Sequence, residues 1–499
     1  MSFDFTTSTA TRGFYLVAKE PVTVEGNALS FTMDVRGDAS GVWPRLQVAD
    51  AEGTVTNLDG DTVEHEGWDQ VRFTVPDGLA QPLTVQRVRM METRPEAQYT
   101  GDIAVANLQA VTTPATDAPE QAPVHDAALL TTGTVVDRPQ QIAVMSDAQF
   151  IAADPDSGAV EGARRTLREI KQARPDLLVI NGDFVDEASP EDFALAKKIL
   201  EEEWGEEIPY VYVPGNHEVM GGDISNFKEA FGPVTLQQDL GGTRVITLNT
   251  SSGTLAGGGL DQIADLEASL QEASEDEDLT GVTVFFHHPP TDPLPSKSSQ
   301  LTDQREARAV ENLLADFRRT SGTSVALVNG HVGVFHGAAV EGVTTLINGN
   351  SGKNPAGTPA TGGFTGWTML GVDPSAGVVG TAPSTQDRVD WLAAETHPWV
   401  DDLTVQAPAT LRKGTTGQAT ASFTQDGRAV PVAWPVTAQW GGRNVRILDA
   451  DGAKGSDHSG VVRLNPATGE ITAMRPGTAT LQITVNGRTA TTTVKVVPR

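Results

Sequence analysis

Residues 176–218 decide the fold of the central part of this chain, and they read DLLVINGDFVDEASPEDFALAKKILEEEWGEEIPYVYVPGNHE. An apolar run at residues 176–180 is followed by a helical pattern at residues 190–204 and a second apolar run at residues 209–213. Short apolar strands that alternate with helices are typical of a layered α/β fold. Because the polar segments GDFVD and GNHE directly follow the two strands, we expect functional groups at the carboxyl ends of these strands.

The same alternation extends in both directions along the chain. Upstream, residues 142–146 predict a strand and residues 160–173 predict a helix. Further strands are predicted at residues 244–249, 282–286, 325–329 and 344–347. Polar segments again follow the strands, and they are Asp147-Ala148-Gln149, His287-His288-Pro289-Pro290 and Gly330-His331. The strand ends therefore bring carboxylate, amide and imidazole groups, which are ligands for divalent metals, to one edge of the fold.

The composition limits the classes of protein that fit this chain. Its 499 residues, 38% of them hydrophobic, are enough for about two to four globular domains. A net charge of −29 argues against nucleic-acid binding by a basic patch, although a metal ion could supply local positive charge for a phosphorylated substrate. Cysteine is absent, which excludes disulfides and thiolate chemistry. The sequence contains no apolar run long enough to span a membrane, and its first residues lack the pattern of a signal peptide.

The regions on either side of the α/β pattern are predicted to be β-structure. Before it, short alternating runs at residues 28–35, 43–48 and 70–75 are separated by turn residues. After it, Asn-Pro, Thr-Gly and Pro-Gly pairs separate short alternating strands. The expected organisation is a β-sandwich at residues 1–112, a linker at 113–139, the α/β domain at 140–395 and a second β-sandwich at 400–499.

The ordered polar segments resemble the signature of the calcineurin-like metallophosphoesterase family. That signature runs DxH, GDxxD, GNH followed by Asp or Glu, a lone His, and GHxH. Here GDFVD and GNHE match in full, and HHPP and GH follow in the expected order, over roughly half of the chain. The fold class that this resemblance implies is multidomain, with a central α/β metallophosphoesterase sandwich flanked by an N-terminal and a C-terminal β-sandwich.

The resemblance implies a site for two divalent metal ions. Asp183 would bridge both ions, and Asp147 would bind the first. The ligands of the second ion would be completed by Asn216, His287 and His331. The identity of the ions, among Mn, Zn, Fe, Mg and Ca, is not distinguishable from the sequence.

The resemblance also implies roles in catalysis for Asn216 and His217. A metal-activated hydroxide would attack phosphorus, and His217 would give a proton to the leaving-group oxygen. A nearby carboxylate, for which Glu218 is the candidate, would orient His217. We expect Asp186, Glu218 and His288 to support the ligands by hydrogen bonding rather than to bind metal.

Two positions depart from the family signature. Gln149 stands where DxH has its histidine, and Gly333 stands where GHxH has its second histidine. In the family both missing imidazoles serve the first ion. Gln149 is a possible weak ligand, while for His336 a structural role and a role as substitute ligand are equally open. We therefore expect one ion to be held firmly and the ion beside Asp147 to be held more weakly, with a preference for harder cations.

The segment GNSGKNP at residues 349–355 follows a predicted strand. Its Asn350 or Lys353 could approach the site and contact a substrate phosphate, but a plain loop is the safer interpretation.

The flanking regions suggest a location. The first resembles jelly-roll, carbohydrate-binding-like modules of secreted enzymes, on WPRLQV (residues 43–48) and GWDQV (67–71). The last resembles bacterial Ig-like domains of the second type, on NPATGEITA (465–473) and PGTA (476–479). The arrangement resembles the C-terminal part of large secreted bacterial proteins. We therefore expect a monomeric, extracellular or cell-surface bacterial protein, of which this chain is a fragment without the export signal.

Two functions from different classes follow. The first is a secreted phosphoesterase, with diesters preferred over monoesters and a phosphorylated glycan as the expected substrate. The second is a module with one metal ion that binds phosphorylated cell-surface glycans with little or no turnover. The ligands around the first ion discriminate between the two. Cyclic-nucleotide hydrolysis needs the same core and stays open.

Overall fold

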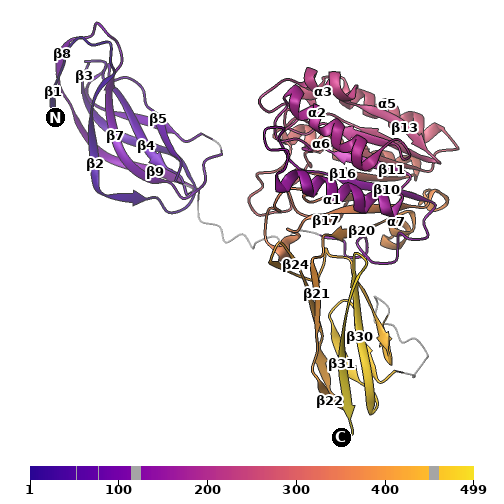
Figure 1. The fold of residues 1–499 in the computed structure, drawn as a ribbon. Helices are drawn as coiled ribbons and strands as arrows, with labels where there is room; N and C mark the ends of the chain where they lie inside the picture. Colours follow the sequence, from indigo (N-terminus) through magenta and orange to yellow (C-terminus); the bar gives the residue numbers. More distant parts are fainter. Residues whose placement is uncertain (52, 77, 114–124, 449–459) are drawn as a thin grey trace. The chain divides into compact units, whose positions relative to one another are not determined.

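The computed structural model describes residues 1–51, 53–76, 78–113, 125–448 and 460–499. The chain divides into two compact units, Met1–Gln121 and Ala122–Arg499. In Figure 1 the first unit is drawn in indigo to violet and consists of strands, whereas the second contains both helices and strands. No helix among the described residues is long and apolar enough to cross a membrane.

The N-terminal unit is a β-sandwich, as the alternating pattern predicts. Its strands are β1 (Ser2–Phe5), β2 (Arg12–Thr23), β3 (Ala28–Asp38), β4 (Trp43–Ala49), β5 (Val55–Asp59), β6 (Glu66–Thr74), β7 (Thr84–Glu92), β8 (Tyr99–Asp102) and β9 (Ala104–Thr112). One sheet has the order β2-β7-β4-β5, another the order β6-β3-β9, and β1 pairs with β8. Successive side chains of a strand point to opposite faces, so Phe31, Met33 and Val35 of β3 all face the shared core.

Two sheets form the centre of the second unit. The first contains β10 (Gln140–Met145), β11 (Leu177–Asn181), β12 (Tyr210–Val213), β19 (Gly366–Val372) and β20 (Leu392–Pro398), in the order β12-β11-β10-β19-β20. The second contains β13 (Leu236–Leu240), β14 (Thr243–Thr247), β15 (Gly281–Phe285), β16 (Ser324–Asn329), β17 (His336–Val340) and β18 (Val343–Ile347), in the order β13-β14-β15-β16-β18-β17. Strands β10–β12 run parallel to one another, as do β14, β15, β16 and β18.

Helices cover the outer face of each central sheet. They are α1 (Gly158–Ala173), α2 (Pro190–Ile199), the π-turn η1 (Leu200–Trp204), α3 (Ile224–Phe231), α4 (Leu255–Gly258), α5 (Gln262–Glu275), α6 (Gln304–Ser321) and α7 (Thr385–Trp391), with short 3₁₀ turns η2 (Pro359–Thr361) and η3 (Pro374–Ala376). Helices α1, α2 and α3 pack on the first sheet, and α5 and α6 pack on the second. A third apolar cluster fills the space between the sheets. The result is a four-layer sandwich, and it confirms the layered α/β fold that the sequence pattern predicts.

Local sequence signals account for the helix ends near the site. Ser189 caps α2 in a capping box with Asp192, and Pro190 takes the first helical position. The predicted helix at residues 190–204 is continuous in the structure, although its last turn is a π-turn that ends at Gly205.

The C-terminal residues form further sheets of short strands. The strands are β21 (Asp402–Gln406), β22 (Thr410–Arg412), β23 (Thr416–Gln418), β24 (Thr420–Gln425), β25 (Arg428–Pro431), β26 (Gln439–Arg443), β27 (Val445–Ile447), β28 (Val462–Leu464), β29 (Glu470–Ala473), β30 (Gly477–Val485) and β31 (Arg488–Val497). Three small sheets result, β21-β24-β25, β22-β31-β30-β26 and β23-β29-β28-β27. The described residues are thus β-rich here, and the Ig-like assignment stays a prediction.

These strands share a core with the α/β layers. Phe335 and Phe364 stack at a centroid distance of 4.4 Å and join one buried cluster with Phe423, Val430 and Ile483. The buried amide of Gln425 accepts a hydrogen bond from the backbone of Thr365 at 2.9 Å and donates one to it at 2.6 Å. The strand-rich C-terminal part is therefore packed onto the α/β layers by both apolar and polar contacts.

The predicted linker at residues 113–139 falls partly on residues 114–124, which lie outside the described residues. Of the rest, Leu129, Leu130 and Val135 are buried, and Asp126 pairs with Arg388 at 3.1 Å. These residues pack onto the α/β layers, because their apolar side chains find partners there. The predicted domain limits otherwise remain a prediction.

Candidate metal centre

Five parallel strands from the two central sheets end at the site. Asp147 follows β10, Asp183 follows β11 and Asn216 follows β12, all in the first sheet. His287 and His331 follow β15 and β16 in the second sheet. The carboxyl ends of both sheets therefore deliver the predicted ligands, as the strand-end rule for α/β folds anticipates.

Two glycines let the backbone of the first sheet approach the site closely. A Cβ atom on Gly182, whose φ is +89°, would lie 2.3 Å from Nδ1 of His287. A Cβ atom on Gly215 would lie 2.3 Å from Oδ1 of Asp183. Both contacts are far shorter than real Cβ contacts, so the glycines of GDFVD and GNHE are required by the packing of the ligands themselves.

Several polar residues at the site adopt the left-handed backbone conformation. Asp147, Gln149, Asp183 and His331 have φ values of 56°, 52°, 53° and 68°. Residues without a glycine's freedom rarely adopt such angles, and they do so mainly where the surrounding structure compels them. The clustering of this strain marks the strand ends as a functional site.

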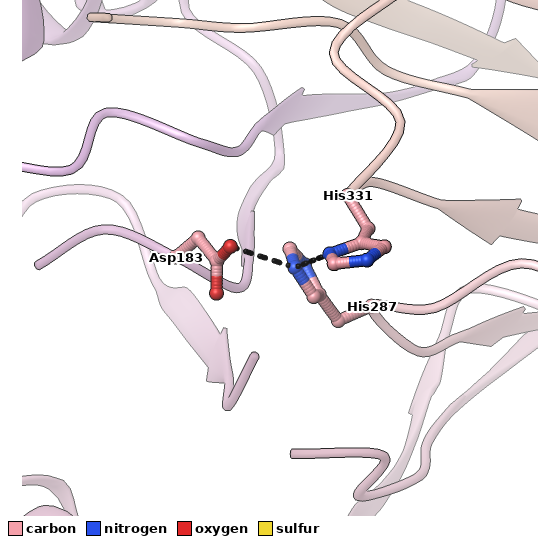
Figure 2. Close-up of side chains that lie close together, drawn as sticks. All are labelled: Asp183, His287 and His331. Carbon is pink, nitrogen blue, oxygen red and sulfur yellow. Dashed lines mark hydrogen bonds and ion pairs between the residues drawn. The ribbon is translucent and has the colours of Figure 1, made fainter. Parts of the chain in front are cut away.

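Asp183, His287 and His331 form a compact group that can hold a metal ion. One ligand atom from each lies within 4.8 Å of the others. Figure 2 shows the His287 ring between the other two side chains, with Nε2 of His287 at 3.0 Å from Oδ2 of Asp183 and 3.2 Å from Nδ1 of His331. Nδ1 of His287 lies 2.8 Å from the carbonyl oxygen of Asn181, an arrangement that directs Nε2 towards the site.

The charges of this group are strongly coupled. Burial alone would raise the pKa of Asp183, but the neighbouring His287 outweighs it and lowers the pKa below its usual value. Burial would lower the pKa of His287, yet the carboxylates of Asp183 and Asp147 raise it to about 9. Burial, together with the charge of His287, lowers the pKa of His331 to about 3. A proton on His287 thus balances the buried carboxylates, and a cation placed among these side chains would do the same.

Unpartnered buried oxygens test whether the site fits a cation. Asp147 is fully buried, and its Oδ2 accepts a hydrogen bond from the His331 amide at 3.1 Å. Its Oδ1 and the Oδ1 of Asn216 are buried, and neither has a hydrogen-bond partner among the residues that the structure describes. An unpaired buried acceptor is costly, and a divalent cation satisfies such oxygens. Together with two imidazoles and the Asp183 carboxylate, the donor set fits a divalent metal.

His217 lies at the edge of this group. Its amide donates to Oδ1 of Asp183 at 3.0 Å, and its ring Nε2 lies 3.8 Å from Oδ2 of the same residue. Its Nδ1 lies 2.8 Å from the carbonyl oxygen of Asp186 and 3.1 Å from the Asp186 carboxylate. The side chain is partly exposed, so it is reachable from solvent.

Asp186, rather than Glu218, is the partner of the His217 ring. Glu218 is fully buried and accepts hydrogen bonds from the amides of Asp183 and Gly215 and from the hydroxyl of Tyr212, at 2.8, 2.6 and 2.5 Å. The adjacent side chains of His217 and Glu218 diverge from the tight turn. Glu218 therefore ties the GDFVD and GNHE segments together, which corrects our assignment of it as the group that orients His217.

His288 packs beside the metal group. Its ring lies 4.1 Å from the His331 ring, and its Nδ1 lies 3.2 Å from the hydroxyl of Thr250. Burial and the charges of His287 and His331 lower the pKa of His288 to about 2. The ring is therefore neutral and supports its neighbours, and Thr250 is a contact that the sequence did not suggest.

The corner beside Asp147 differs from the family signature in its packing. The Gln149 amide donates to Oδ2 of Asp183 at 3.0 Å. Gly333 has a φ of +73°, and a Cβ atom there would lie 2.8 Å from Cβ of Ala356 and 3.0 Å from Oδ1 of Asn350. A histidine at this position would clash with the loop. His336 begins β17, and its ring meets the Trp434 ring edge-on at 5.4 Å.

The donor set fits a divalent metal, and comparison with known proteins identifies the family of the chain. The profile of the calcineurin-like phosphoesterase family matches residues 141–335. A probable cyclic nucleotide phosphodiesterase of Rhodococcus erythropolis is 30% identical over 230 residues, which cover 42% of this chain and 70% of that protein. The glycerophosphodiester phosphodiesterase GpdQ of Enterobacter lignolyticus is 30% identical over 165 residues, 30% of this chain and 53% of that protein.

Among solved structures, a purple acid phosphatase from yellow lupin seeds aligns with 76% of this chain and 74% of its own, at 12% identity and a TM-score of 0.36. The sequence relationships suffice for assignment. The chain belongs to the calcineurin-like phosphoesterase family.

Proposed function

We propose that this chain is a metal-dependent phosphodiesterase. The observation that carries the proposal is the group formed by Asp183, His287 and His331, whose ligand atoms converge within 4.8 Å from three strand ends. Buried unpartnered oxygens of Asp147 and Asn216 complete the acceptors around it. Leaving such oxygens unpaired destabilises the fold, so a cluster with a purely structural role would not be expected to gather five polar groups from five strands.

Asp183, Asn216, His287 and His331 would hold one divalent ion firmly. Asp147 and Gln149 would hold a second ion more weakly, because both imidazoles that the family uses there are missing. When bound, such ions act as Lewis acids that draw charge from phosphoryl oxygens. The buried walls of the site strengthen every charge interaction inside it.

His217 is the group of this chain that would handle a proton. Asp186 fixes its Nδ1 at 2.8 to 3.1 Å, which leaves Nε2 directed towards Asp183 and the ion position. A ring held in this way can give a proton to an oxygen that leaves phosphorus. The Asp183 carboxylate accepts a hydrogen bond from the His217 amide, which fixes the proton donor relative to the ion position.

A diester is the substrate class that we favour. Two relatives at 30% identity carry phosphodiesterase names, one for cyclic nucleotides and one for glycerophosphodiesters. Our expectation of a secreted protein that acts on glycan-linked phosphate rests on the flanking β-sandwiches and remains part of the proposal. Cyclic nucleotides are the competing diester class, and a panel of diester substrates separates them.

A binding module with one ion is the second candidate. It is favoured by one observation, the loop that leaves no room for a side chain at Gly333. If the first ion position has lost its function, the domain would bind a phosphorylated ligand without turnover.

Hydrolysis assays separate the two candidates. Metal-stripped protein would be given Mn²⁺, Zn²⁺, Mg²⁺ or Ca²⁺ and assayed with bis-(p-nitrophenyl) phosphate and p-nitrophenyl phosphate. We expect metal-dependent turnover, faster on the diester, and its loss in Asp183→Ala and His217→Ala. Absence of turnover with every ion, in protein that binds one ion per chain, would favour the binding module.

A further inference from the structure

The loop at residues 349–354 is hydrogen-bonded to the segment that carries Asp147. It lies next to the part of the site where the imidazoles of the family signature are missing. The Ser351 amide donates to the carbonyl oxygen of Ser146 at 2.8 Å, and the Ser351 hydroxyl accepts from the Ser146 amide at 3.1 Å. The Lys353 amide donates to the carbonyl oxygen of Asp147 at 3.4 Å. The loop at residues 349–354 therefore runs alongside the strand end that carries Asp147, and its position is fixed by the backbone.

The same loop occupies the space of the missing histidine. Ala356 donates its amide to the carbonyl oxygen of Gly333 at 3.2 Å, and its Cβ lies where a side chain on Gly333 would go. Asn350 is fully buried, and its amide nitrogen donates to the carbonyl oxygen of Asn354 at 2.6 Å. Its Oδ1 has no partner and lies against Gly333. The space of the missing imidazole is therefore filled by the Ala356 methyl group and the Asn350 side-chain oxygen.

The loop also brings a positive charge. Lys353 is half-buried, and across the described residues no carboxylate forms an ion pair with its ammonium. The backbone hydrogen bond from Lys353 to the carbonyl oxygen of Asp147 keeps the base of this side chain next to the strand end that carries the ligand. Most lysines in the described residues make no ion pair, so what distinguishes Lys353 is the position of its backbone next to Asp147.

We infer that the ammonium of Lys353 replaces the second cation. It binds the phosphoryl oxygens of the substrate and repels a second ion, so that one divalent ion is enough for substrate binding and hydrolysis. This inference rests on the proposed function and names the substrate-binding group of that site.

Charge balance supports this arrangement. The buried carboxylates of Asp147 and Asp183 bring two negative charges, which one divalent ion neutralises. Glu218 is a further buried carboxylate, but backbone amides and the Tyr212 hydroxyl compensate its charge. The ammonium of Lys353 then leaves one positive charge for the single negative charge of a phosphodiester. A lysine is suited to this task because its ammonium is a compact charge that binds phosphate from any direction.

Lys353→Met tests the inference, because it keeps the length of the side chain and removes the charge. The full chain is loaded with Mn²⁺, and two quantities are measured: binding of inorganic phosphate by calorimetry and Mn²⁺ stoichiometry by EPR titration. We expect phosphate affinity to fall about tenfold and affinity for a second Mn²⁺ to rise by a similar factor. Lys353→Arg should restore most of the phosphate affinity.

A matched control is Lys228→Met, which removes the same charge from the exposed surface of α3 and should change neither quantity. Unchanged phosphate and Mn²⁺ binding in Lys353→Met would overturn the role of the lysine. If the unaltered chain hydrolyses the diester in that case, the proposed function still stands. If the unaltered chain binds phosphate without hydrolysing the diester, and Lys353→Met weakens that binding, the lysine's role stands and the phosphodiesterase proposal falls. An unaltered chain that binds no phosphate would overturn both.

Discussion

The two halves of the metal centre are built from the same strand ends but by different means. The half around His287 has three ligand atoms within 4.8 Å of one another, and two glycines at which a side chain would collide with those ligands. The half around Asp147 has one unpartnered carboxylate oxygen, an amide at Gln149 and a loop in place of an imidazole. If the proposed sites are correct, the difference teaches that a fold can keep the ligands of one ion position while loop residues occupy the place of the ligands of the other.

Asp183→Asn should disrupt the half of the site around His287 and have the largest effect on metal binding and hydrolysis. Asp183 contacts His287 and accepts a hydrogen bond from the amide of His217. Its charge therefore serves both to bind the ion and to position the proton donor. We expect loss of tightly bound metal and a fall in diester hydrolysis on the order of 10³-fold or more, measured by elemental analysis and steady-state kinetics. Retention of both metal and turnover would show that the ion lies elsewhere.

His217→Gln should separate chemistry from metal binding. The ring lies beside the ion position but outside the group formed by Asp183, His287 and His331. We expect kcat on a poor leaving group to fall roughly 10²–10⁴-fold while metal content stays unchanged. The fall should shrink for p-nitrophenolate, which needs little protonation. Loss of metal together with activity would instead make His217 a ligand.

The strands around the site and the polar residues that follow them could be predicted from the sequence. Strands β10, β11 and β12 and the residues after them follow from short apolar runs ending in polar segments, a local signal. The partner of His217 was not predictable, because the directions of neighbouring side chains in a turn depend on the backbone path. For Lys353 the sequence left a plain loop and an approach to the site both open, because that approach depends on hydrogen bonds between segments about two hundred residues apart in the sequence.

Gly333→His should sharpen the comparison, because it restores the histidine of the family signature in the half of the site around Asp147. The new side chain would meet Ala356 and Asn350 at a backbone angle of φ +73°. We expect a loss of unfolding free energy of about 2–3 kcal/mol and no gain in tightly bound metal. Urea denaturation and elemental analysis give the two numbers. A stable variant with a second firmly bound ion would show that the loop yields easily.

His397 offers a pH test away from the metal centre. Burial lowers the pKa of this histidine to about 4, although Asn486 hydrogen-bonds its ring at 3.1 Å. The unfolded chain, with a histidine pKa near 6.5, binds the proton more tightly than the folded chain does. The contribution of the neutral histidine to stability is therefore fully present above pH 6.5, and about 3 kcal/mol of it is lost as pH falls from 6.5 to 4.

His397→Gln should flatten that part of the pH profile of unfolding in urea without affecting metal content. Parallel profiles for the two proteins would place the proton uptake at another group. The measurement also shows how much acid sensitivity belongs to the fold rather than to the ligands.

The ion content of the purified chain tests the central claim most directly. After extensive dialysis against metal-free buffer, elemental analysis should find one firmly held divalent ion per chain, and a second should bind weakly and preferably as Mn²⁺, Mg²⁺ or Ca²⁺. Two tightly held zinc or iron ions per chain would contradict the account, because the half around Asp147 would then hold its ion as firmly as the half around His287.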